Sequence, residues 1–291
     1  MIDPPPQSSE SGSATVAPAP PATSPAPPTS APAPPAEEIA AEAARLVGLA
    51  MAEELRVRLM GGLAIRLQSP TAQHPPYVRV YRDLDLVAHR RDVAALRRLL
   101  EREGYVGDKL FNAIHGAQRL VYTAASGRWS VDVVIDDLAM SHTIVLKDRL
   151  ETDGPTLDLA DLLLTKLQIW ETNEKDLGDI VCLLADHPLA PAGQLVAGPA
   201  DDGGPGPIDL VRLRAVLGSD WGLCHTVERN LRAVADAWAR RPAPDAPYPV
   251  DAQVAALLAD IEAAPKTLGW KTRARVGERV RWYETPEEAR R

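Results

Sequence analysis

The sequence predicts an α+β fold, with a small mixed sheet flanked by helices and followed by an all-helical C-terminal region. Three observations favour it. Segments with the two-residue alternation of strands fall between residues 56 and 135, apolar residues at helical spacing surround them, and helical spacing continues beyond residue 208. No internal repeat interrupts this order, so a solenoid or repeat array is not expected.

The first elements follow from composition and from helix-breaking residues. A helix is expected over residues 37–55, which are rich in Ala, Leu and Glu. A short strand at 56–60 follows, and Gly61-Gly62 separates it from a short helix at 63–67. Residues 69–77 contain three prolines in a polar run and are expected to form a loop.

The sheet is expected to take its remaining strands from three alternating segments, at 78–88, 118–123 and 129–135, the last two joined by a turn at 125–128. The amphipathic segment 91–103 predicts a helix that Gly104 ends. Six further helices are expected at 157–171, 174–185, 209–217, 220–240, 250–263 and 277–283.

Composition divides the chain into four parts. Residues 1–36 hold twelve of the 27 prolines and no Lys, Arg or aromatic residue, which predicts a disordered tail and excludes a secretory signal. The other parts are a domain at 37–187, a Pro- and Gly-rich linker at 188–207 and a helical domain at 208–291.

Charge and cysteine content exclude several classes of protein. The formal net charge of −8 argues against non-specific coating of duplex DNA. No apolar run is long enough to span a membrane, so no membrane partner is expected. The two cysteines lie in apolar helical patterns and do not form a disulfide framework, which predicts a reduced, cytoplasmic protein.

Three aspartates on two predicted strands are the sharpest chemical signal. Asp83 and Asp85 are two residues apart, so their side chains project from the same face of a strand. Asp132 lies in the apolar strand 129–135, and if the two strands are neighbours the three carboxylates converge. Such a cluster fits a hard divalent cation such as Mg²⁺. The alternative is an ordinary solvated strand face.

The Gly61-Gly62 pair adds a second signal. It stands between a strand-like run and a helix start, where backbone N–H groups and the helix dipole favour an anion. A diglycine alone predicts only a turn. A strand, a diglycine and a helix, followed about 20 residues later by an acidic pair, form a more specific pattern.

The order of these motifs over residues 55–187 resembles the minimal nucleotidyltransferases of the DNA polymerase β superfamily, and within it the toxin-like AbiEii and MenT branch. The residues that carry the resemblance are Gly61, Gly62, Ala64, Arg79, Asp83, Asp85, Asp132, Lys166, Lys175, Asp176 and Asp179. That branch usually carries Thr or Ser where this chain has Tyr81.

The resemblance implies a nucleotidyltransferase that uses an NTP. Asp83 and Asp85 would hold two Mg²⁺ ions, and Asp132 would complete the metal site or accept the proton of the acceptor hydroxyl. Gly61, Gly62, Arg79, Lys166 and Lys175 would bind the nucleotide. Candidate acceptors are an RNA such as tRNA, a protein or a small molecule, and a toxin would have an antitoxin partner.

Alternatives remain open. Tyr81 favours a non-catalytic binding module on the same fold, and an antibiotic-modifying nucleotidyltransferase is a second alternative. Lys166 either contacts phosphate or extends its ammonium group to solvent. Lys175 and Asp179 either belong to the site or form a surface ion pair. Residues 266–283 mix basic and aromatic side chains, which either bind nucleic acid or dock on the helical region.

Overall fold

The computed structural model describes residues 32–152, 154–190 and 206–285 of the 291-residue chain. Residues 1–31 of the predicted tail and most of the predicted linker therefore lie outside the described residues. The division into two domains stays a prediction.

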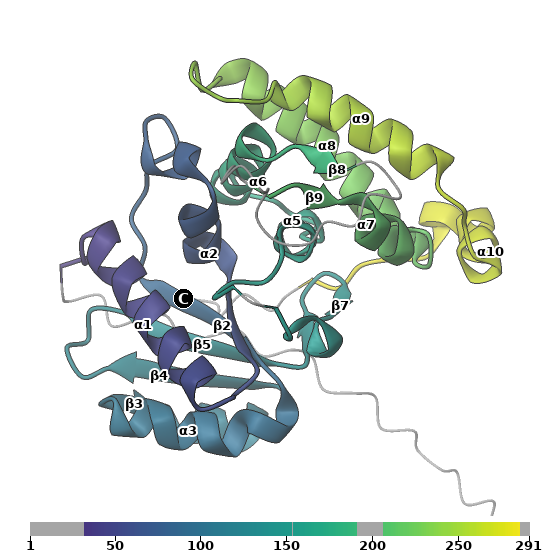
Figure 1. The fold of residues 1–291 in the computed structure, drawn as a ribbon. Coiled ribbons are helices and arrows are strands. Elements are labelled where there is room, and N and C mark those ends of the chain that lie inside the picture. The colour runs from purple at the N-terminus through teal and green to yellow at the C-terminus, as the bar shows by residue number, and fades with distance from the viewer. Residues whose placement is uncertain (1–31, 153, 191–205, 286–291) are drawn as a thin grey trace, which may run out of the picture.

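A five-stranded mixed sheet forms the centre of the N-terminal half (Figure 1). Its strands, in spatial order, are β1 (Val57–Met60), β2 (Asp83–Ala88), β5 (Ser130–Ile135), β4 (Arg119–Ala124) and β3 (Tyr105–Gly107). β2 and β5 are parallel, and the other three pairs are antiparallel. Helices flank this sheet, so the predicted fold class is confirmed.

Four helices pack on the sheet in the described part of the chain. They are α1 (Ala36–Ala52), α2 (Gly61–Gln68), α3 (Val93–Arg102) and α4 (Lys109–His115). Two further helices, α5 (Leu159–Leu167) and α6 (Glu174–Asp186), pack on α2. α1 packs on β1 and α3 packs on β3, whereas α2 contacts β2 on one side and α5 and α6 on the other. α2 therefore connects the sheet to the rest of the molecule.

The C-terminal half consists of helices that cover α5 and α6 (Figure 1). They are α7 (Leu210–Leu217), α8 (Trp221–Arg240), α9 (Val250–Ala263) and α10 (Leu268–Val276). α8 packs on α5, α6 and α9. Two short strands, β8 (Leu189–Ala190) and β9 (Ile208–Asp209), pair in parallel where the chain enters this region.

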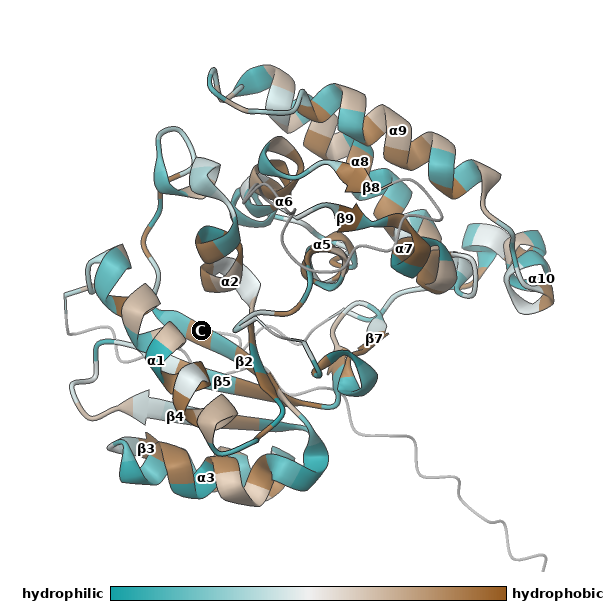
Figure 2. Cartoon of the chain, in the orientation of Figure 1, coloured by the Kyte–Doolittle hydropathy of each residue, from teal (hydrophilic) through white to brown (hydrophobic). Residues whose placement is uncertain are grey.

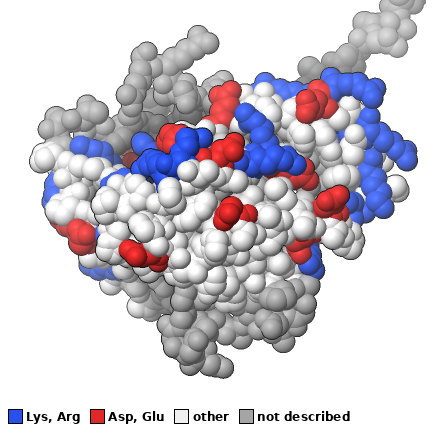
Figure 3. Space-filling model, turned by 90° about the horizontal axis from the view of Figure 1, so that it is seen from above, with Lys and Arg blue, Asp and Glu red and all other residues white. Residues whose placement is uncertain are grey.

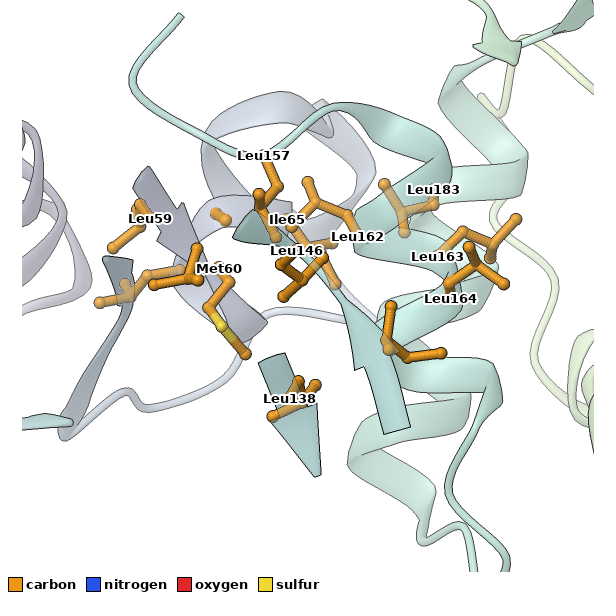
Figure 4. Close-up of a cluster of buried hydrophobic side chains, with 14 of the residues drawn as sticks. Leu59, Met60, Ile65, Leu138, Leu146, Leu157, Leu162, Leu163, Leu164 and Leu183 are labelled. Carbon is orange, nitrogen blue, oxygen red and sulfur yellow. The ribbon is translucent and has the colours of Figure 1, made fainter. Parts of the chain in front are cut away.

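Buried apolar side chains run continuously from the sheet into the helices. Leu59 and Met60 of β1 lie on one side of the cluster in Figure 4, and Leu162 of α5 and Leu183 of α6 lie on the other. Figure 2 shows apolar and polar residues alternating around α3 and α9, as expected for helices that bury one face. Among the described residues, no helix combines the length and the apolar composition that crossing a membrane requires.

The second strand is shorter than its sequence pattern predicts. Alternation extends from residue 78, but β2 begins at Asp83. Its partner β1 ends at Met60, which pairs with Asp85, and the chain then turns into α2. On the other side, β5 begins at Ser130, which pairs with Asp83. Residues 78–82 therefore have no strand residues to pair with on either side, and Val80 is 63% exposed.

The sequence reading also missed or misplaced short elements. The strands β3, β6 (Asp137–Ala139) and β7 (Thr143–Val145) and the helix α4 (Lys109–His115) were not predicted. A helix over 277–283 was predicted and is wrong, because α10 ends at Val276 and Gly277 has φ 59°. A positive φ ends an α-helix, and only glycine adopts it without strain.

The aromatic residues of the C-terminal segment dock on the helices. The Tyr283 ring stacks on Trp170 with centroids 4.3 Å apart, and the Trp282 indole N–H donates to Thr226 of α8 at 3.3 Å. The docking interpretation is therefore confirmed for the aromatic residues of this segment, whereas its Val276 and Val280 are 38% and 57% exposed. Its basic side chains lie at the surface: Figure 3 shows Lys and Arg along the right edge, the side of α10 in Figure 1.

Candidate active site

The three aspartates of the sequence motif lie on one face of the sheet. β2 and β5 are parallel neighbours, with Asp85 opposite Asp132 and Asp83 opposite Ser130. Residues opposite each other in a parallel pair point to the same side, so four polar side chains share this face. The Ser130 hydroxyl donates a hydrogen bond of 2.7 Å to Oδ1 of Asp83, which orients that exposed carboxylate.

Gly61 brings the start of α2 directly over this face. Met60 pairs with Asp85 at the end of β1, and the next residue, Gly61, has φ 69°. A β-carbon at Gly61 would lie 2.1 Å from Oδ2 of Asp85. Only glycine fits this close approach in this backbone conformation. Met60 occupies the N-cap position and has no oxygen or nitrogen in its side chain to cap the helix.

Asp85 is the most strongly perturbed carboxyl group of the face. Burial and the nearby carboxylates of Asp132 and Asp83 together raise its pKa to about 7, against the opposing effect of Lys166 and Arg119. A carboxylate with a raised pKa gains from a bound cation, because the cation restores the charge balance that burial and repulsion disturb.

Arg119 of β4 contributes a cation to the same face. Its Nε donates to Oδ1 of Asp132 at 2.7 Å, and its Nη2 donates to Oδ2 of the same carboxylate. The pair is bidentate, which is the strongest geometry between an arginine and a carboxylate. The Asp132 side chain is 10% exposed and that of Arg119 is 32% exposed.

A second cluster of charged side chains lies close to the start of α2, and it is centred on Asp179 of α6. Arg79 donates to both oxygens of Asp179, with Nη2 at 3.0 and 2.9 Å. The Lys166 ammonium lies 2.9 Å from Oδ2 of Asp179 and 2.8 Å from Oδ1 of Asp176. Two cations and two anions thus form one network.

This network decides between the alternative interpretations of Lys166 and of the Lys175–Asp179 pair. Lys166 does not extend to solvent: its side chain is 14% exposed. Burial lowers its pKa, but Asp179 and Asp176 raise it more, so the pKa lies above its usual value and the ammonium stays charged. Asp179 does not form the predicted surface pair with Lys175, because it binds Arg79 and Lys166. Lys175 itself is exposed in the first turn of α6.

Gly62 and Tyr81 hold Arg79 in place. A β-carbon at Gly62 would lie 1.9 Å from Nη2 of Arg79, so the absent side chain leaves room for the guanidinium. The Arg79 guanidinium carbon lies 4.3 Å from the centroid of the Tyr81 ring, a cation–π contact. Tyr81 is buried, and its ring forms one wall for Arg79 instead of presenting a hydroxyl to a ligand.

The fold thus brings most of the expected site residues together. Asp83, Asp85, Asp132 and Gly61 share one face, and Lys166 is close enough to influence the pKa of Asp85. Lys175 is the residue that stays outside both groups.

Arg119 and Ser130 were not predicted as members of the site, although a signal for them existed. The strands 118–123 and 129–135 were expected to form a hairpin with a short turn. Counting antiparallel pairs back from that turn puts Val121 opposite Asp132 and Arg119 on the same face. The register of a predicted hairpin would therefore have identified both residues.

The arrangement of these carboxylates does not form a ready three-ligand metal centre. Among the described residues, no group of three His, Cys, Asp or Glu side chains is placed to hold a metal ion. Arg119 binds both oxygens of Asp132. Asp83 and Asp85 remain as an acidic pair that fits a hard cation.

Comparisons with known proteins give no family membership. No protein-family model matches the chain, and a search of curated proteins finds no match. The crystal structure of the lincosamide antibiotic adenylyltransferase LnuA with bound lincomycin is similar at 15% identity and a TM-score of 0.35, covering 48% of this chain and 92% of that one. An antigenic nucleotidyltransferase-like protein from Paracoccidioides brasiliensis has 13% identity and a TM-score of 0.37, covering 79% and 95%. These scores are too low to carry weight for the site.

Proposed function

We propose that the chain is a Mg²⁺-dependent nucleotidyltransferase, which moves a nucleoside monophosphate from an NTP to an acceptor hydroxyl. One observation carries the proposal: the Asp83 and Asp85 carboxylates share a sheet face on which Gly61 places the start of α2. A cation site and an anion site thereby adjoin, as a metal–triphosphate complex requires.

The acidic pair supplies the cation side of this site. Asp83 and Asp85 would hold the metal through carboxylate oxygens, with Ser130 orienting Asp83 by its 2.7 Å hydrogen bond. When bound, Mg²⁺ offsets the negative charge that develops on the phosphoryl oxygens and on the leaving pyrophosphate. The raised pKa of Asp85 supports this assignment, because its buried charge lacks a full counter-charge within the face.

The start of α2 and the network behind it supply the anion side. The first N–H groups of an α-helix have no partner within the helix, and the N-cap residue here, Met60, cannot provide a side-chain oxygen. These groups would bind the phosphates of the nucleotide, as the sequence pattern at Gly61 and Gly62 predicts. Arg79 and Lys166, held in place by Asp179, would add hydrogen-bond donors for the phosphates.

The reaction follows from this placement. The acceptor oxygen forms a bond to the α-phosphorus, and the bond from that phosphorus to the oxygen bridging to the β-phosphate breaks, so pyrophosphate leaves. The proton of the acceptor hydroxyl is released to solvent water. The chain would orient the triphosphate between the carboxylate pair and α2, which favours in-line attack on the α-phosphorus.

The proposal extends to the molecule that accepts the nucleoside monophosphate. The sequence resemblance to the AbiEii and MenT branch favours a toxin of a toxin–antitoxin pair, with an RNA such as tRNA as acceptor and an antitoxin protein as partner. A small-molecule acceptor, as in antibiotic nucleotidyltransferases, is the second enzymatic candidate. Fold alone does not choose between acceptors.

The test incubates the full chain with each α-labelled NTP, Mg²⁺ and total cell extract, and then identifies the labelled species. We expect label on a macromolecule or small molecule together with pyrophosphate release, and neither with Asp83→Asn. Nucleotide binding without label or pyrophosphate release, for all four NTPs, would instead identify a non-catalytic binding module. Label on a small molecule alone would exclude the RNA acceptor.

A further inference from the structure

The charged side chains of the sheet face leave room for one divalent cation. The face carries three carboxylates, Asp83, Asp85 and Asp132, and one guanidinium, Arg119, so its formal charge is −2. The neighbouring network pairs two cations with two anions and adds no net charge of its own. One divalent ion therefore neutralises the face of the nucleotide-free protein, whereas a second would leave it positive.

Arg119 stands where a second cation would have to bind. Its guanidinium takes both oxygens of Asp132, with Nε at 2.7 Å from Oδ1 and Nη2 on Oδ2. Its charge also reaches Asp85, whose pKa it lowers. An ion approaching Asp132 would meet this positive charge at short range, and like charges in a partly buried site repel strongly.

The pair is fixed by the sheet and cannot open at low cost. Asp132 lies on β5 opposite Val121 of β4. Arg119 lies two residues before Val121, so it is on the same face of β4. The Asp132 side chain is 10% exposed, so parting it from Arg119 would leave a buried carboxylate with weaker compensation.

We propose that Arg119 is a permanent counter-charge of the site, that a single divalent cation binds between Asp83 and Asp85, and that Asp132 is a positioning residue for Arg119 rather than a metal ligand. This inference rests on the proposed function, because that proposal supplies the metal site. It replaces the two-ion, three-carboxylate site that the sequence resemblance implies.

The stoichiometry of metal binding tests the proposal. Mn²⁺ alone is titrated into the nucleotide-free full chain, and the free ion is counted by electron paramagnetic resonance. We expect one Mn²⁺ per chain in wild type and none in Asp83→Asn. Two ions per wild-type chain would overturn the inference and leave the proposed function intact. No bound ion at all would overturn the metal-dependent function as well.

Two variants separate a counter-charge from a merely structural pair. Arg119→Gln removes the guanidinium and frees Asp132, so Mn²⁺ should bind about tenfold more tightly or a second ion should appear. The double variant Arg119→Gln with Asp132→Asn keeps the charge of the face at −2, so one ion should bind with an affinity within about threefold of wild type. If Asp132 is a ligand, the double variant loses about tenfold or more, which would overturn the proposal.

A matched control removes an arginine guanidinium elsewhere in the sheet region. Arg90→Gln breaks the Arg90–Asp136 pair, whose Nε–Oδ2 distance is 3.0 Å, and should leave Mn²⁺ binding unchanged. Circular dichroism confirms that each variant folds. If Arg119→Gln does not fold because Asp132 is left buried, the charge-balanced double variant still decides the question.

Discussion

The α-carbon of Gly61 faces the carboxylate of Asp85 so closely that a β-carbon would lie 2.1 Å from Oδ2. This contact joins two features that are 24 positions apart in the sequence, the turn between β1 and α2 and the acidic strand β2. It accounts for the glycine by geometry, because a larger residue would displace the carboxylate that the site needs.

Gly61→Ala is therefore expected to abolish activity and to lower the free energy of unfolding. The φ of 69° strains any residue with a β-carbon, and the added methyl group meets Asp85. We expect a loss of roughly 2–4 kcal/mol in the free energy of unfolding, measured by urea denaturation. Gly48→Ala is the control: it lies within α1, where a β-carbon meets nothing within 4 Å. It should stabilise the protein by about 0.5–1 kcal/mol. Equal effects of the two substitutions would contradict this account.

The second glycine makes a different prediction, because it accommodates Arg79. In Gly62→Ala the new β-carbon displaces the guanidinium, whose Nη2 lies 1.9 Å from its position. A flexible side chain can move, so the fold should survive while the Arg79–Asp179 pair is lost. We expect NTP affinity to fall about tenfold, as for the loss of a charge-assisted hydrogen bond to an anion.

A double-variant cycle checks this explanation. Arg79→Met should lower NTP affinity by a similar factor, and Gly62→Ala combined with Arg79→Met should add little to either change. Additive losses would mean that Gly62 acts on the nucleotide directly and not through Arg79.

The sequence predicts the acidic face well because the governing rule is local. Alternation along a strand places Asp83 and Asp85 on one side, and Leu84 and Leu86, both almost fully buried, on the other. The apolar strand around Asp132 then becomes the expected neighbour. Helix positions in the central part of the chain follow from spacing in the same way.

What the sequence does not predict depends on partners distant in the chain. β2 begins at Asp83 because its parallel partner β5 begins at Ser130, which pairs with Asp83, a limit that no pattern within residues 78–88 contains. Lys166 is buried because Asp179, thirteen positions later, turns toward it from the next helix. Its own helix, rich in leucine, indicates only that a lysine there needs a partner.

The raised pKa of Asp85 predicts how stability depends on pH. The native pKa of about 7 lies above the unfolded value near 3.8, so the native state binds a proton between about pH 4 and 7 that the unfolded state does not. Stability contributed by the protonated form is present below about pH 4 and is lost as pH rises through 7. Asp85→Asn removes this loss, because the amide does not ionise.

In a chelating buffer, Asp85→Asn should therefore gain about 1–4 kcal/mol relative to wild type between pH 4.5 and pH 8. Urea denaturation at both pH values measures the change. Adding Mg²⁺ at pH 8 should stabilise wild type and leave the variant unaffected. Parallel stability curves for the two proteins would show that Asp85 ionises in the native state as it does in the unfolded chain.

The last prediction concerns Lys166, whose ammonium lies between the carboxylates of Asp176 and Asp179 at 2.8 and 2.9 Å. Lys166→Met keeps the length and the apolar stem but leaves Asp176 without its cation in a largely buried position. Removing one member of a buried pair costs about 3–5 kcal/mol when nothing replaces it. Arg79 still binds Asp179, so we expect a loss of about 2–4 kcal/mol in the free energy of unfolding.

Lys175→Met is the matched control. Lys175 lies nine positions after Lys166 and its side chain is exposed, so this substitution should change the free energy of unfolding by no more than about 0.5 kcal/mol. Adding Asp176→Asn to Lys166→Met should recover part of the loss, since it removes the carboxylate that lacks a partner. Titration with a non-hydrolysable NTP at fixed Mg²⁺ then separates structure from binding. If the double variant regains stability but binds the nucleotide about ten- to a hundredfold more weakly than wild type, Lys166 contacts the phosphates. Wild-type affinity in that variant would restrict Lys166 to a structural role.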